Sequence, residues 1–132
     1  TRAALTWDPS AALVPGRTIT GSTYFVVDAS AAAQDLDQTI AFPARAPRPV
    51  AHADFSADRF VASTDDAAAC RGSYRNPTAP RGRVCAYLST TTASKVDITQ
   101  LFPGANRGFV VRATAAAPGS LVVDFSWAYT AP

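Results

Sequence analysis

The sequence of 132 residues contains no glutamate and no methionine, and it has one lysine, Lys95, and one histidine, His52. Glutamate, methionine and lysine are among the strongest helix formers, so their scarcity favours strands. No apolar run approaches the roughly 18 residues that a membrane-spanning helix needs. No secretory leader is present either, so we expect no transmembrane segment and a mature chain if the protein is secreted.

Charge is sparse. Charged residues make up 17% of the chain, which is below the roughly 25% of typical soluble domains. Eleven of the twelve basic residues are arginine, all ten acidic residues are aspartate, and the net charge is +2. So small a net charge argues against a nucleic-acid partner. A thinly charged surface favours association with copies of the chain or with another partner.

The chain has the length of one domain. We assign residues 13–132 to this domain and residues 1–12 to an N-terminal arm or first strand. Leu5 and Trp7 alternate in the arm with polar residues, as in a strand that pairs with another strand. Such an arm can add a strand to the sheet of a neighbouring subunit.

The dominant periodicity is two, which is typical of strands with one buried face. Within residues 121–129 the large apolar side chains fall on the odd positions. The same alternation predicts strands around residues 19–27, 84–88 and 109–114, and shorter candidates lie at 38–42, 50–55, 59–63 and 95–99.

Turn residues separate these segments. The ten prolines suit turns and sheet edges better than helix interiors. The one helix candidate is 30–37, where three alanines favour a helical turn, and an irregular loop is the alternative. About eight short strands with frequent turns predict an all-β fold, a single antiparallel β-sandwich of jelly-roll type with one disulfide.

Cys70 and Cys85 are the only cysteines, and fourteen residues separate them. A structural zinc site needs four ligands, and no Cys-x-x-Cys pair is present. We therefore predict a disulfide, with two buried thiols as the alternative. Disulfides persist in oxidising compartments, so we expect a secreted, extracellular or cell-surface protein.

Basic and aromatic residues gather in and beside the segment between the cysteines: Arg71, Tyr74, Arg75, Arg81 and Arg83. One interpretation is an exposed surface for an anionic glycan, a phosphate-rich polymer or a neighbouring subunit. The other is a solvated loop whose arginines keep a sparsely charged protein soluble.

No catalytic or metal motif stands out. His52, Asp54 and Ser56 have the residue types of a hydrolytic triad, but their spacing on a strand provides no nucleophile elbow around the serine. The acidic clusters at 35–37 and 65–66 lack the spaced oxygen ligands of a calcium loop. We predict no enzyme activity, no cofactor and no metal site.

Several aromatic residues are candidates for stacking on a sugar ring: Trp7, Trp127, Tyr24, Tyr74, Tyr87 and Tyr129. Most of them follow the strand alternation, so we expect those in the core. Tyr74 is the exception, because it lies between the cysteines.

Most of the chain, from about Leu13 onward, resembles a secreted domain common in actinobacteria, which often lies at the C-terminal end of collagen-like surface proteins. The shared positions are Cys70-x-Gly72-Ser73, Asn76-Pro77-x-Ala79-Pro80-x-Gly82, Val84-Cys85-x-Tyr87, Gly108-Phe109-x-Val111 and Trp127-Ala128-x-Thr130-Ala131-Pro132. The resemblance implies an extracellular β-sandwich with no known catalysis and a role in assembly or display at the cell surface. The sequence lacks a collagen repeat, which suggests a free-standing subunit.

Three functions follow as hypotheses. The leading one is a secreted, non-enzymatic structural subunit that associates with copies of itself into an oligomer or filament. The second is a module that binds a cell-wall or surface glycan through the segment between the cysteines. The third is a hydrolase with a dispersed site, for which the sequence offers no support.

Overall fold

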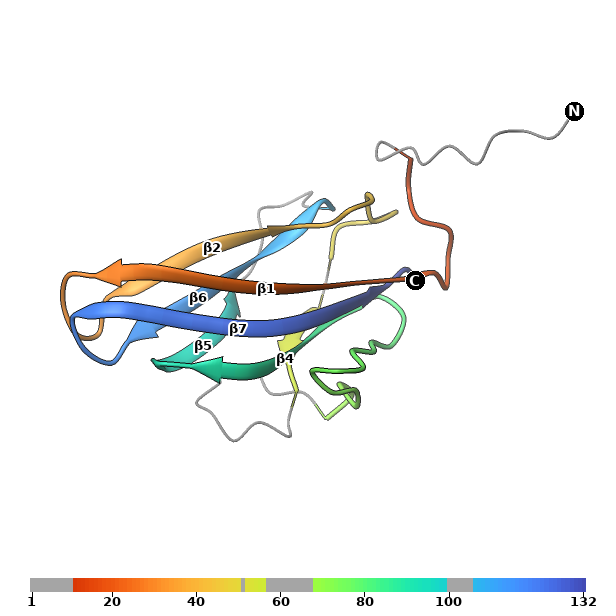
Figure 1. The fold of residues 1–132 in the computed structure, drawn as a ribbon. Helices are drawn as coiled ribbons and strands as arrows, with labels where there is room; N and C mark the ends of the chain where they lie inside the picture. The colour runs from red at the N-terminus through yellow and green to blue at the C-terminus, as the bar shows by residue number, and fades with distance from the viewer. Residues whose placement is uncertain (1–10, 51, 57–67, 100–105) are drawn as a thin grey trace, which may run out of the picture.

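The computed structural model describes residues 11–50, 52–56, 68–99 and 106–132. In that part of the chain there are seven strands and no helix (Figure 1). The strands are β1 (Thr18–Ala29), β2 (Asp35–Ala41), β3 (His52–Phe55), β4 (Arg83–Thr91), β5 (Ala93–Thr99), β6 (Gly108–Ala115) and β7 (Gly119–Thr130). The prediction of an all-β fold is confirmed for the described residues.

The strands form two sheets. The larger has the order β1-β7-β4-β3 and the smaller the order β2-β6-β5. Figure 1 shows β1 and β7 of the larger sheet in front of β6 of the smaller sheet. All neighbours are antiparallel except β3 and β4, which run parallel. The expectation of a purely antiparallel arrangement is therefore wrong at this pair, because a long connection between β3 and β4 allows the chain to return before β4 begins.

Seven of the eight expected segments form strands, and the eighth, 59–63, lies outside the described residues. The main difference in boundaries is at β2, which begins at Asp35 inside the helix candidate 30–37. The carboxylate of Asp35 accepts a hydrogen bond from Thr114 at 2.6 Å, and Asp37 pairs with Arg112 at 2.8 Å. These cross-strand contacts outweigh the weak helix propensity of the preceding alanines.

The two sheets share one core. Phe109 of β6 contacts Phe125 and Trp127 of β7, with ring centroids 6.5 and 5.7 Å apart. Phe42, which follows β2, stacks on Tyr129 of β7 at 5.0 Å. The alternation expected from the sequence places these side chains on the inner faces, where they leave water together.

The structure also bears on membrane insertion. Within the described residues, no helix has the length and apolar character to span a bilayer.

Candidate interaction surface

The four-stranded sheet has an inner face toward the main core and an outer face away from it. On β4, Val84, Ala86 and Leu88 belong to the main core. Their neighbours Cys85 and Tyr87 point to the outer face, where they form a second, smaller apolar cluster with Cys70. Residues 70–82, which we call the covering loop, supply the cover for this part of the outer face.

The predicted disulfide is confirmed. Cys70 and Cys85 are bonded, with their Cα atoms 5.5 Å apart, and the described residues include no free cysteine. Both residues are almost fully buried. The bond therefore fixes the start of the covering loop to the middle of the sheet.

The hydroxyl of Tyr87 makes hydrogen bonds to two parts of the covering loop. It donates a hydrogen bond to the carbonyl oxygen of Thr78 and accepts one from the backbone N–H of Gly72 at 2.9 Å. A Cβ atom at Gly72 would lie 2.6 Å from the backbone nitrogen of Thr78, so this close approach requires glycine. One buried phenol thus joins the two sides of the loop.

The end of the covering loop is bonded to β7. Thr130 donates its hydroxyl to the carbonyl of Ala79 at 2.8 Å and accepts the N–H of Gly82 at 2.7 Å through its own carbonyl. The covering loop is therefore attached to the sheet at its start, through Cys70, and at its end, through residues 79–82. The loop is a packed part of the domain, while several of its side chains still reach solvent.

The five residues singled out beside the cysteines make different contacts in the structure. Arg83 makes an ion pair with Asp54 of β3. The guanidinium of Arg81 lies against the backbone at Gly16, because a Cβ atom built there would be 2.8 Å from its Nη2. Arg71 and Arg75 are exposed. Leu5 and Trp7, the remaining candidates, lie outside the described residues.

Tyr74 reaches from the covering loop to β7. Its hydroxyl donates a hydrogen bond to Asp124 at 3.0 Å, and this bond raises the pKa of the Tyr74 phenol above its usual range. Asp124 lies directly opposite Tyr24 in the pairing of β7 with β1. A carboxylate therefore stands between two tyrosines, one from the loop and one from the sheet.

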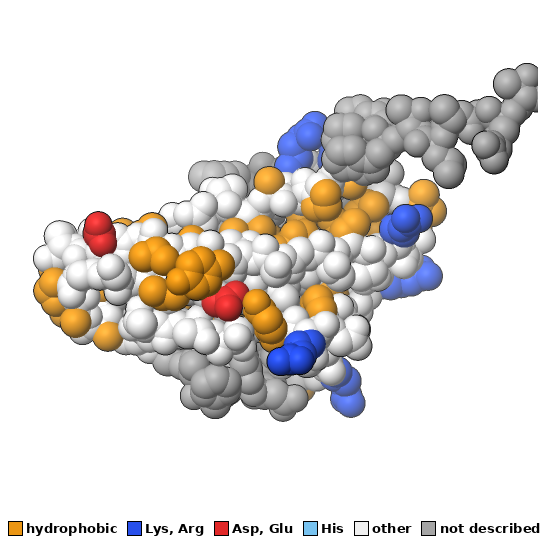
Figure 2. Space-filling model, in the orientation of Figure 1, with side chains coloured by type: hydrophobic (Ala, Val, Ile, Leu, Met, Phe, Trp, Pro, Cys, Tyr) orange, Lys and Arg blue, Asp and Glu red, His pale blue; other side chains and the backbone are white. Residues whose placement is uncertain are grey.

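The uncovered part of the outer face carries exposed apolar side chains. Tyr24 is 66% exposed and Val26 is 49% exposed, and among the described residues Val14 is the one other large apolar residue that is exposed. Val122 of β7 lies opposite Val26 and is half-buried. Figure 2 shows an apolar patch over β1 and β7, next to an acidic side chain. Patches of this kind on soluble proteins mark contact surfaces.

Val26 is not among the residues that the sequence singles out, and Tyr24 is there only a candidate for stacking on a sugar ring. The expectation that strand-periodic tyrosines lie in the core is right for Tyr87 and Tyr129 and wrong for Tyr24. The available signal was that Tyr24 and Val26 alternate with Phe25 and Val27, so β1 has apolar side chains on both faces.

The edge strands of the two sheets differ in how well they are protected against pairing with another chain. The four-residue β3 is short, β2 carries Asp35 and Asp37, and β5 carries Lys95 and Asp97. Charges and short length are the usual means by which a sheet edge resists pairing with another chain. β1 has twelve residues and a single charge, Asp28 near its end, and among the described residues it pairs only with β7.

The candidate triad is not assembled in the structure. The carboxylate of Asp54 is engaged by Arg83, and the buried hydroxyl of Ser56 donates to the carbonyl of Cys70 at 3.1 Å. His52 is exposed on β3. Neither of these bonds includes the histidine that a triad would place between the other two groups.

The acidic residues of β2 are used in cross-strand pairs. Two hydrogen bonds from the guanidinium of Arg112, at 2.8 and 3.1 Å, hold the pKa of Asp37 below its usual range. The described residues contain no group of three or more histidine, cysteine or acidic side chains placed to hold a metal ion. The acidic pair at 65–66 lies outside the described residues.

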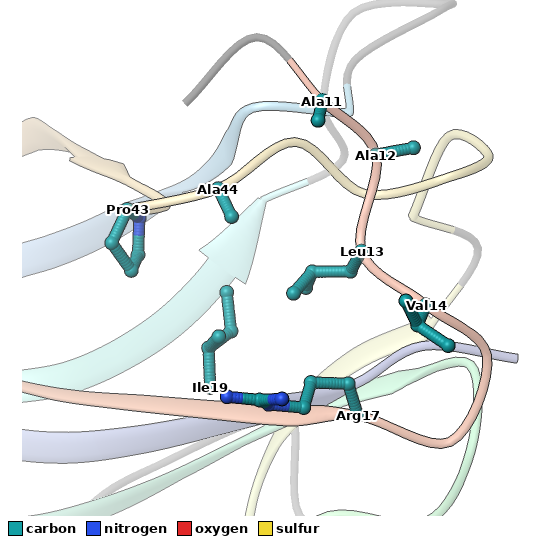
Figure 3. A pocket seen from close by; sticks show the side chains of 8 residues that line it. All are labelled: Ala11, Ala12, Leu13, Val14, Arg17, Ile19, Pro43 and Ala44. Carbon is teal, nitrogen blue, oxygen red and sulfur yellow. The ribbon is translucent and has the colours of Figure 1, made fainter. Parts of the chain in front are cut away.

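A small pocket lies at the beginning of β1, between residues 11–14, the start of the strand and residues 43–44 (Figure 3). Leu13 and Ile19 project into it, and its volume is about 240 Å³. Pockets that hold small molecules usually enclose about 300–1,000 Å³. The lining is mainly small and apolar, with Arg17 as the charged residue.

A comparison of the chain with known protein families, with curated proteins and with solved structures gave no match. The resemblance to the end domain of collagen-like surface proteins therefore stays a prediction.

Proposed function

We propose that this protein is a secreted, non-enzymatic structural subunit that associates with copies of itself at the cell surface or outside the cell. In this proposal the two sheets form a jelly-roll-like β-sandwich. The assembled form is an oligomer or a filament, depending on whether the contacts close or repeat.

The observation that carries the proposal is the edge of β1. β1 is a strand of twelve residues with one charge at the edge of the larger sheet, and among the described residues it pairs only with β7, so its other edge presents backbone groups to a further strand. The exposed Tyr24 and Val26 add an apolar patch beside this edge. Association with another copy would satisfy the backbone groups and remove the patch from water at the same time.

The disulfide supports the extracellular location. Cys70 and Cys85 are both buried and bonded to each other. Such bonds are rare in reducing compartments, where thiols are kept reduced, and are usual in secreted domains.

The experiment is light scattering coupled to size-exclusion chromatography, over a range of protein concentrations, followed by negative-stain microscopy. We expect a mass above that of one chain, rising with concentration until assembly is complete. A monodisperse monomer at every concentration would overturn the proposal.

A second candidate function, the binding of a surface glycan, rests on a different observation. The exposed Tyr24 lies opposite Asp124 in the pairing of β1 with β7, and the carboxylate of Asp124 accepts a hydrogen bond from Tyr74. Aromatic rings stack on sugars, and carboxylates accept hydrogen bonds from sugar hydroxyls.

The two candidates can be separated by testing a panel of neutral and acidic oligosaccharides against the monomeric form by calorimetry. Saturable binding that is lost in Tyr24→Ala would favour the glycan module. Binding that persists in this variant, or no binding to any oligosaccharide, would remove it.

A further inference from the structure

We propose that β1 is the contact between copies, and that two copies pair their β1 strands antiparallel around a two-fold axis at Phe25. In this register Tyr24 lies opposite the partner's Val26, and the two larger sheets become one continuous sheet. The inference rests on the proposed function and names its surface, its partner and its geometry.

The backbone provides the first argument. Antiparallel pairing requires a strand whose second edge is unoccupied, and within the described residues β1 is bonded on one side only, to β7. With the axis at Phe25, residues 21–29 of each copy overlap, and this overlap gives about ten inter-strand hydrogen bonds. β2 carries two aspartates, Asp35 and Asp37, which would repel those of a second copy, and β5 has seven residues, so it offers fewer backbone groups than the twelve-residue β1.

Charge provides the second argument. Residues 18–27 contain no charged side chain, so two antiparallel copies of β1 bring no like charges opposite each other there. In the proposed register Asp28 lies opposite the partner's Ser22. The two Asp28 residues are then six positions apart, about 20 Å along the strand, which is beyond the screening length of about 8 Å at physiological salt.

The side chains select the register. Tyr24 and Val26 are the large exposed apolar residues of β1, and they lie on its outer face two positions apart. A two-fold axis at Phe25 places each against the other in the partner, as two aromatic–β-branched pairs. On the inner face the same axis places the half-buried Phe25 opposite the partner's Phe25, so apolar contacts form on both faces.

In neighbouring registers, Tyr24 and Val26 have less favourable cross-strand partners. A shift by two residues in one direction places Tyr24 opposite the partner's Asp28. A shift in the other direction places Val26 opposite the partner's Ser22. The first shift also pairs Val26 with the partner's Val26, and the second pairs Tyr24 with the partner's Tyr24. Each alternative therefore leaves one of the two apolar residues against a polar one, whereas the axis at Phe25 gives both an apolar partner.

Two double variants test the register by charge. Tyr24→Lys with Val26→Lys places like charges directly opposite each other in both cross-strand pairs, and we expect association to weaken about a hundredfold or more. Tyr24→Lys with Val26→Asp makes both pairs oppositely charged, and we expect association to return. Both positions are exposed in the single chain, so the fold should be unaffected.

The matched control adds the same charge to another edge. Thr39→Lys with Ala41→Lys changes two exposed positions of β2 and should leave association unchanged. Sedimentation equilibrium measures the dissociation constant of each variant, and circular dichroism verifies the fold.

The outcomes separate this inference from the proposed function. If the unmodified chain is a monomer, the proposed function fails. If it assembles and both double variants assemble equally well, the β1 contact fails and the proposed function stands. If both double variants dissociate, β1 is the contact and the register is wrong.

A truncation separates the partner's β1 from the other strand that could occupy the edge. Deletion of residues 1–8 should leave the dissociation constant unchanged if β1 pairs with β1. Loss of assembly on deletion would instead assign the edge to the N-terminal arm of a neighbour and overturn the inference.

Discussion

Tyr87 shows how a single residue determines the shape of a surface segment. Its ring is buried in the small outer cluster and its hydroxyl bonds the covering loop at Gly72 and at Thr78. A phenol is suited to this role because its ring can be buried while its hydroxyl both donates and accepts a hydrogen bond. The ring of Tyr87 therefore packs beneath the covering loop, and its hydroxyl links two parts of the loop by hydrogen bonds.

We predict that Tyr87→Phe lowers the free energy of unfolding by about 1–3 kcal/mol, because two backbone groups lose their partner while the ring stays in place. Urea denaturation followed by circular dichroism measures the change. Tyr24→Phe is the control, because Tyr24 is 66% exposed and its hydroxyl has no hydrogen-bond partner among the described residues. This substitution should change stability by less than about 0.5 kcal/mol. Equal effects of the two substitutions would contradict this role of Tyr87.

At the scale of an element, the covering loop is a segment without regular structure that is nevertheless fixed. The disulfide attaches its start to β4, and Thr130 attaches residues 79–82 to β7. Gly72 allows a backbone approach that any side chain would obstruct. These three attachments explain why a stretch rich in turn residues can cover a sheet.

We predict that Cys70→Ala with Cys85→Ala lowers the free energy of unfolding by about 3 kcal/mol, the value for closing a loop of this length in the chain-entropy model. The hydrogen bonds of Tyr87 remain, so the variant should fold, with the covering loop more open to proteases. Denaturation and limited proteolysis, with the cut sites mapped by mass spectrometry, test both parts. A variant as stable as the parent, and equally resistant to cleavage, would mean that the disulfide adds nothing to the other attachments.

At the scale of the whole molecule, one side chain outside the regular strands joins the two sheets. Phe42 follows β2 of the smaller sheet and lies within 5.0–6.0 Å, centroid to centroid, of Tyr129, Trp127 and Phe109. Two of these rings belong to β7 of the larger sheet. The stability of the common core therefore depends on a residue at the end of a strand.

We predict that Phe42→Ala lowers the free energy of unfolding by about 3–5 kcal/mol, because a large buried ring leaves a cavity between the sheets. That is a large part of the roughly 5–15 kcal/mol that stabilises a typical domain. Val14→Ala removes an apolar side chain that is 70% exposed, and it should have little effect. Chemical denaturation of both variants measures the difference, and a Phe42→Ala variant as stable as Val14→Ala would refute the bridging role.

The sequence by itself determined the secondary structure class and the covalent link. Alternation with period two in residues 121–129 is local information. It predicts the strand correctly because each strand must bury one face whatever its neighbours are. The pairing of Cys70 with Cys85 follows in the same way, since no other cysteine exists. Seven strands were therefore found without any knowledge of their partners.

Only the tertiary structure decided which edges stay open and which faces are covered. That Asp37 meets Arg112, and that the covering loop shields Tyr87 but leaves Tyr24 exposed, depends on residues distant in the chain. Local alternation cannot distinguish these cases, because it shows that a strand has two faces and does not show what lies against either. The unprotected edge of β1, on which the proposed assembly rests, exists because strand order places β7 on one side of it and no other described strand on the other.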